Sequence, residues 1–139
     1  MTRKGVWNLQ QVRDKYLQDL WANDFYLYGW GYNIDGTQGN NTVGNPAPGG
    51  SGPSVIASSP VQVGTGTNWS SVSGKQAYYS EYFRLQTKTD GTLWAWGRND
   101  KGQLGHNDLA KRSSPTQIPG TTWTSNLSVG YHASSCIKT

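Results

Sequence analysis

An internal repeat is the feature that most constrains what this chain can fold into. The copies share a Trp-Gly pair, several turn glycines and asparagines, a Ser-Pro pair and a later Trp. The matched segments are residues 30–41 with 96–107, 58–63 with 113–118, Trp69 with Trp123, and 87–89 with 137–139. A repeat of roughly 50 residues is typical of propellers and solenoids, in which neighbouring units bury each other's apolar faces.

Each copy reads as short strands joined by tight turns. Residues 93–96 (Leu-Trp-Ala-Trp) form a short aromatic strand, and Asp90 with Gly91 before it is a hairpin signal. Gly97 follows where a Cβ would find no room, and Pro115 opens the next strand, where a missing N–H is tolerated. We therefore expect a mainly β fold, a partial β-propeller of about two Trp-Gly repeats over residues 25–139.

Two insertions separate the copies. The larger, residues 43–57, is rich in Gly, Pro and Ser and is expected to be an exposed loop. The smaller lies near residues 74–82 and has no counterpart in the second copy, so its tyrosines are candidates for surface contacts: Tyr78, Tyr79 and Tyr82. The repeat-matched tryptophans suit core packing better than a sugar-binding platform, and the expected repeat core is Trp30, Trp69, Trp94, Trp96 and Trp123.

Residues 1–24 follow a different pattern. Apolar residues recur there at spacings of three and four, which predicts one amphipathic helix, with Asn8 as its N-cap. We expect an N-terminal helical attachment segment that docks on a partner, although a helix that caps an open end of the propeller is an equal alternative. The predicted partner-binding residues are Trp7, Leu9, Val12, Tyr16, Leu17, Leu20 and Trp21.

The charge distribution argues against nucleic acid as a partner. The 139 residues carry a formal net charge of +4, and residues 84–139 hold seven Lys or Arg against three Asp. An anionic partner would explain this excess, but the cations are scattered, and adjacent pairs occur only at 3–4 and 111–112. A nucleic-acid footprint needs clustering, so a solvated surface is the favoured interpretation.

The residues that usually carry chemistry are few and separated. Cys136 is alone, so no internal disulfide can form, and His106 and His132 have no carboxylate or thiol partners at metal-ligand spacing. Asp35 and Asp100 sit in turns, where aspartate usually bonds its own backbone. We expect no enzyme activity and no catalytic, cofactor or metal site. We also expect no signal peptide and no membrane span.

The second copy resembles a known family. Residues 93–105 (Leu-Trp-Ala-Trp-Gly-Arg-Asn-Asp-Lys-Gly-Gln-Leu-Gly), followed by Ser114 and Pro115, are similar to the regulator of chromosome condensation repeat. The resemblance implies a seven-bladed β-propeller of four-stranded blades. The first copy is more divergent, since Thr37 starts a Thr-Gln-Gly where the family shows Gln-Leu-Gly. The family's exchange-factor and chromatin roles do not transfer, because no position here matches their functional residues.

Two functions stay open. Residues 5–9 resemble the leader that precedes such repeats in predicted phage virion or appendage proteins. Our main hypothesis is a structural virion component, a tail appendage or decoration, made in the host cytoplasm and attached through its N-terminal segment. Its expected partners are other virion or assembly proteins, in a homo- or hetero-oligomer, and a host-surface glycan, with no membrane. The alternative is a cellular propeller scaffold that binds a protein or nucleic acid.

The attachment hypothesis predicts the effect of deleting residues 1–22. If the segment docks on a partner, the repeats fold unchanged, as judged by circular dichroism, while co-sedimentation with the parent assembly is lost. If the repeats fail to fold without the segment, it is a cap instead.

Overall fold

The computed structural model describes residue 10 and residues 24–44, 56–70 and 82–139. Gln10 is helical, and the rest of the expected N-terminal helix lies outside the described residues, as do Tyr78 and Tyr79. No helix in the described part has the length and apolar character needed to cross a membrane.

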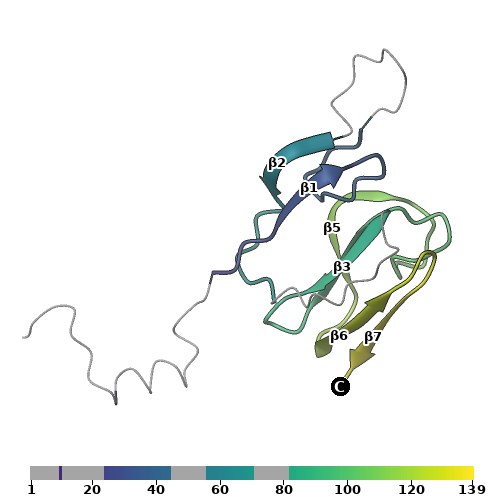
Figure 1. Ribbon diagram of the computed structural model, residues 1–139. Helices are drawn as coiled ribbons and strands as arrows, with labels where there is room; N and C mark the ends of the chain where they lie inside the picture. Colours follow the sequence, from purple (N-terminus) through teal and green to yellow (C-terminus); the bar gives the residue numbers. More distant parts are fainter. Residues whose placement is uncertain (1–9, 11–23, 45–55, 71–81) are drawn as a thin grey trace, which may run out of the picture.

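The described chain forms three antiparallel sheets, which confirms the mainly β prediction (Figure 1). The N-terminal sheet pairs β1 (Tyr28–Tyr32) with β2 (Ile56–Gln62). The central sheet has the order β3 (Phe83–Thr87), β4 (Leu93–Gly97), β5 (Arg112–Ile118). The C-terminal sheet pairs β6 (Trp123–Val129) with β7 (Ser134–Lys138). Residues 56–57, expected at the end of the insertion loop, are strand residues because they pair with β1.

The N-terminal sheet repeats the outer part of the central sheet at backbone level. Both β1–β2 and β4–β5 shift register at a tryptophan, Trp30 in one and Trp96 in the other. The glycine that follows each Trp is left-handed, with φ of 100° at Gly31 and 104° at Gly97. An extra residue at a bulge bends the strand, and only glycine adopts this φ at low cost. The sequence repeat is therefore a structural repeat.

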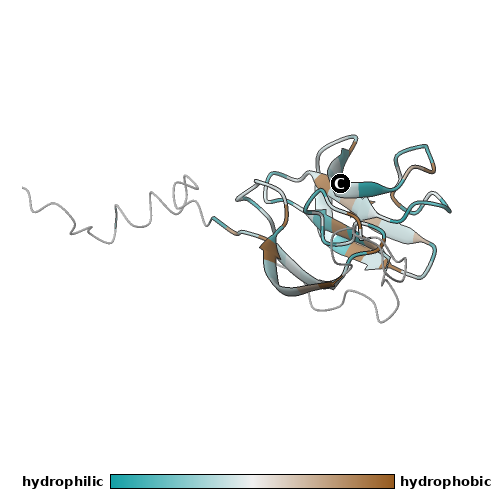
Figure 2. Cartoon of the chain, turned by 90° about the horizontal axis from the view of Figure 1, so that it is seen from above, coloured by the Kyte–Doolittle hydropathy of each residue, from teal (hydrophilic) through white to brown (hydrophobic). Residues whose placement is uncertain are grey.

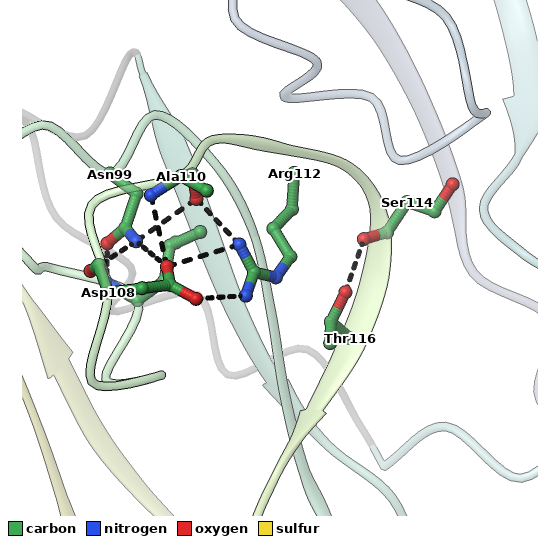
Figure 3. Close-up of polar contacts among 7 residues, drawn as sticks. Asn99, Asp108, Ala110, Arg112, Ser114 and Thr116 are labelled. Atoms are coloured by element: carbon green, nitrogen blue, oxygen red, sulfur yellow. Dashed lines mark hydrogen bonds and ion pairs between the residues drawn. The ribbon is translucent and has the colours of Figure 1, made fainter.

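A buried asparagine holds the turn after each Trp-Gly pair. Asn99 is fully buried, and its Oδ1 accepts the N–H of Leu104 at 2.9 Å. Its Nδ2 donates to the carbonyls of Asp108 and Ala110 at 2.9 and 3.1 Å (Figure 3). Asn33 does the same in the first copy, accepting the N–H at position 38 and donating to the carbonyl at position 42. A primary amide supplies the acceptor and both donors that this turn needs.

The C-terminal sheet repeats the inner part of the central sheet. Trp123 pairs with Lys138 on β7, as Trp69 pairs with Lys88 just after β3. In both places the ammonium group lies over the indole ring, 4.9 Å from the centroid at Trp69 and 5.5 Å at Trp123. The N-terminal sheet (β1 and β2) thus corresponds to the β4–β5 part of the central sheet. The C-terminal sheet (β6 and β7) corresponds to the part of the central sheet that contains β3.

The core is divided between the two contacts that the central sheet makes. Figure 2 shows that hydrophobic residues are interspersed with hydrophilic ones along the described chain, and the buried residues fall into two clusters. The cluster towards the N-terminal sheet contains Val63, Trp69 and Trp96, with Leu27 and Trp94 packed against it. The cluster towards the C-terminal sheet contains Phe83, Leu85, Leu93, Ala95, Leu104 and Val129. Both clusters therefore combine residues of neighbouring sheets.

We predict that Gly97→Ala destabilises the fold more than Gly31→Ala, although both glycines have nearly the same φ. A Cβ at Gly97 would lie 2.4 Å from the Tyr82 carbonyl oxygen, whereas a Cβ at Gly31 meets nothing within 4 Å. Backbone strain costs about 1–2 kcal/mol at both positions. The clash adds about 1–3 kcal/mol at Gly97 alone. Urea unfolding measures both, and equal losses would contradict the prediction.

We also predict that Asn99→Ala lowers the free energy of unfolding by about 2–3 kcal/mol, because the Leu104 N–H and two carbonyls lose their partner inside the protein. Asn126 is exposed on β6, and Asn126→Ala is the matched control, with an expected change within about 0.5 kcal/mol. Thermal and urea unfolding of the two variants provide the test.

Candidate binding surface

Trp96 shows how one sheet contacts the next in this fold. Its side chain leaves β4, is 2% exposed, and donates its Nε1–H to the Thr37 carbonyl of the preceding repeat at 2.9 Å. Gly39 makes room for the ring, since a Cβ there would lie 2.9 Å from Nε1. Val63 and Trp69 complete the pocket, with the two indoles edge to face at 5.9 Å. We call this pocket the Trp socket.

Trp30 occupies the same position in the first copy but is not in the core. We expected it to be a core residue, and it is 65% exposed instead. The physical reason is that the face of β1 on which it lies has no described sheet against it. Tyr28 and Tyr32, on either side of Trp30, are each 49% exposed. These three side chains form what we call the aromatic face.

A groove lies beside the aromatic face, between β1 and β3. It has a volume of about 280 Å³, and its lining includes Trp30, Trp96, Arg84 and Gln86. A neighbouring hollow of about 460 Å³ is lined by Trp30, Tyr32, Tyr82 and Arg84. Among described strands, β1 pairs only with β2, whereas its counterpart β4 pairs on both edges. The groove therefore lies along an edge of β1 that no other described strand pairs with, and this edge borders exposed aromatic rings.

Several cations of the described residues are engaged with other groups. Arg98 binds Asp100 at 2.8 Å, and Arg112 binds Asp108 at 2.7 Å (Figure 3). The hydrogen bonds from these guanidinium groups lower the pKa of both carboxyl groups below the ordinary aspartate value. Lys88 lies 4.2 Å from the Trp94 ring centroid. The described positive charges are thus spread out and partly neutralised.

The other predicted site residues are placed as follows. Trp69 is 2% exposed, and Trp94 and Trp123 are partly buried. Tyr82 is partly buried, packs edge to face on Tyr131 at 5.7 Å, and carries the Arg98 guanidinium over its ring at 5.2 Å. The predicted partner-binding residues of the N-terminal segment lie outside the described residues.

Sequence reasoning missed Tyr28, Tyr32 and Arg84 as members of the surface. A signal was present: β1 reads Tyr-Gly-Trp-Gly-Tyr, with a ring at every second position and glycine between. Alternate residues of a strand share a face, so this pattern places all three rings together.

The described residues hold no group of three or more His, Cys, Asp or Glu that could bind a metal ion. Asp100 is committed to its ion pair with Arg98, and burial lowers the pKa of His106. The geometry supports binding through aromatic rings and a strand edge.

Comparison with known proteins identifies the family of the second copy of the repeat. Residues 90–137 match the family model described as the regulator of chromosome condensation (RCC1) repeat. Over 49 residues, the chain is 51% identical to "Protein RCC2 homolog" of Danio rerio and 49% identical to "Protein RCC2" of Homo sapiens. Each match covers 35% of this chain and 9% of the relative, so the similarity spans under a tenth of those proteins. The second copy is thus an RCC1-type repeat, as its motifs indicated.

Proposed function

We propose that this chain is a binding scaffold built from propeller-type blades, and that its aromatic face contacts another protein. The observation that carries the proposal is the 65% exposure of Trp30 between two half-exposed tyrosines. Protein interfaces are enriched in Trp and Tyr, and a few such residues supply most of the binding energy. The edge of β1 that no other described strand pairs with would offer backbone hydrogen bonds to the same partner.

A protein suits this surface better than a nucleic acid. Phosphate contacts need several unpaired cations on one face. Here Arg98 and Arg112 already bind aspartates, and Lys88 and Lys138 stack on indole rings. Arg84 is the cation that lines the groove beside the aromatic face. One arginine beside three aromatic side chains is typical of a protein interface.

The comparisons favour the cellular scaffold over the virion appendage. The matched relatives, Protein RCC2 and its homologue, are animal proteins. The similarity covers only the repeat, so what those proteins bind does not transfer. The virion hypothesis stays a prediction without support from these relatives.

Site-directed photo-crosslinking tests the proposed binding surface. Benzoylphenylalanine replaces Trp30 in the full natural chain, expressed in its own host, and adducts are identified by mass spectrometry. We expect a discrete protein adduct. Leu109 is 66% exposed and lies outside the aromatic face, so the same replacement there is a control matched for exposure.

Adducts of equal yield and identity at both positions would show non-specific contact. A nucleic acid adduct at position 30, or none, would contradict the proposal. Any specific protein adduct supports it, whether the captured protein is another molecule or a second copy of this chain.

A further inference from the structure

The turn that follows each Trp-Gly pair joins one sheet of this protein to the next. In the first copy, the Thr37 carbonyl accepts the Trp96 Nε1–H of the central sheet at 2.9 Å. In the second copy, the carbonyl at the equivalent position belongs to Gln103, and it accepts the Ser134 hydroxyl of β7 at 2.7 Å. The turn of the second copy, residues 99–111, therefore attaches the central sheet to the C-terminal sheet.

Leu104, the next residue of this turn, adds an apolar contact to the attachment. Its side chain is fully buried in the cluster that the central sheet shares with Val129 of β6. Its N–H donates to Asn99 Oδ1 at 2.9 Å, so the position of Leu104 depends on the closed form of the turn. A change that opens the turn would move Leu104 and loosen the contact between the two sheets.

The turns of the two copies share a backbone but differ at one position. Asn41 and Asn107 occupy equivalent places and are both left-handed, with φ of 61° and 59°. The residue before them is Asn40 in the first copy and His106 in the second. Asn40 Oδ1 accepts the Thr42 hydroxyl at 2.6 Å, and its amide carries no titratable group. At this position, only the turn of the second copy can change its charge with pH.

The neutral form of His106 fits the closed turn better than the protonated form. Its Nε2 atom is buried and has no hydrogen-bond partner. In the neutral imidazole one ring nitrogen carries no proton, whereas in the protonated ring both nitrogens are donors that need acceptors. A buried donor on a charged ring without an acceptor costs more free energy than a buried neutral nitrogen.

The charged groups that act on His106 add to this cost. Burial and Arg112, at the start of β5, lower the pKa of His106 below its ordinary value of 6.5, and together they outweigh the opposite effect of Asp108. The Asp108 carboxylate is already engaged, because it binds the Arg112 guanidinium at 2.7 Å and accepts Asn99 Nδ2–H at 3.1 Å (Figure 3). The closed turn therefore favours the uncharged ring.

From this arrangement we propose that His106 is an acid-sensitive latch between the central and C-terminal sheets. At neutral pH its uncharged ring lets the turn close, and Gln103 and Leu104 hold the C-terminal sheet. At mildly acidic pH the imidazolium opens the turn and releases both contacts. The turn of the first copy, which has Asn40 at the same position, stays closed throughout.

The direction of the pH effect follows from the linkage between proton binding and opening. When the turn opens, the pKa of His106 returns towards its ordinary value of 6.5, which lies above that of the closed form. The open form therefore binds more protons, and the stability of the closed turn falls as the pH drops through this value. Asp108 stays ionised in this range, because its pKa lies below the ordinary aspartate value of 3.8.

Amide hydrogen exchange of the full natural chain, followed by NMR, measures the two turns separately. The Leu104 N–H reports on the second turn, and the Gln38 N–H, held by Asn33 Oδ1 at 2.9 Å, reports on the first. After correction for intrinsic exchange rates, we expect the protection of Leu104 to fall several-fold from about pH 7.5 to about pH 5.5, on either side of the ordinary histidine pKa. The protection of Gln38 should stay constant, and methyl NOEs between Leu104 and the C-terminal sheet should weaken.

His106→Asn is the decisive variant, because it installs the residue that the first copy has at this position. The protection of Leu104 should then become independent of pH in this range. His132→Asn is the matched control, since His132 is the other histidine of the chain and lies exposed between β6 and β7. This control should keep the wild-type response.

Several results would overturn the latch. They are a Leu104 protection that does not change with pH in the wild-type chain, and an equal fall in His106→Asn. A parallel fall at Leu104 and Gln38 would also overturn it, because it would show that the whole fold loosens rather than one turn. Photo-crosslinking at position 30 tests a different surface, so the binding scaffold and the latch can each fail alone.

Discussion

The hydrogen bond from Trp96 Nε1 to the Thr37 carbonyl is the contact on which the arrangement of the sheets depends. It joins residues far apart in the sequence, and it forms only where a glycine leaves space for the indole ring. A neutral hydrogen bond contributes about 1 kcal/mol net, but the buried ring contributes more, because aromatic side chains bury a large apolar area each. In the cluster towards the N-terminal sheet, tryptophan rings accordingly supply most of the buried side chains.

The fold could be predicted from the sequence to the extent that the repeat determines it. Asn99, Gly97 and the hairpin at Asp90 each perform a local backbone task, so their positions predicted turns and strand ends. The aromatic strand around Trp96 likewise predicted a buried blade strand. These features follow from local geometry, which sequence spacing encodes directly.

The candidate surface could not be predicted in the same way. Trp30 and Trp96 occupy the same position in the repeat, yet one is 65% exposed and the other 2%. Burial depends on whether a neighbouring sheet covers the residue, which is a property of the assembly rather than of the motif. Arg84 was missed for a related reason, since the groove it lines arises between strands of different sheets.

The hydrogen bonds of the buried Asn99 also make the fold sensitive to deamidation of this residue. All three acceptors of its Nδ2 are oxygen atoms, and one of them belongs to the Asp108 carboxylate. Deamidation would replace this donor with a negatively charged oxygen and convert each attraction into repulsion. Deamidation of Asn99 would therefore weaken the turn that follows the Trp-Gly pair.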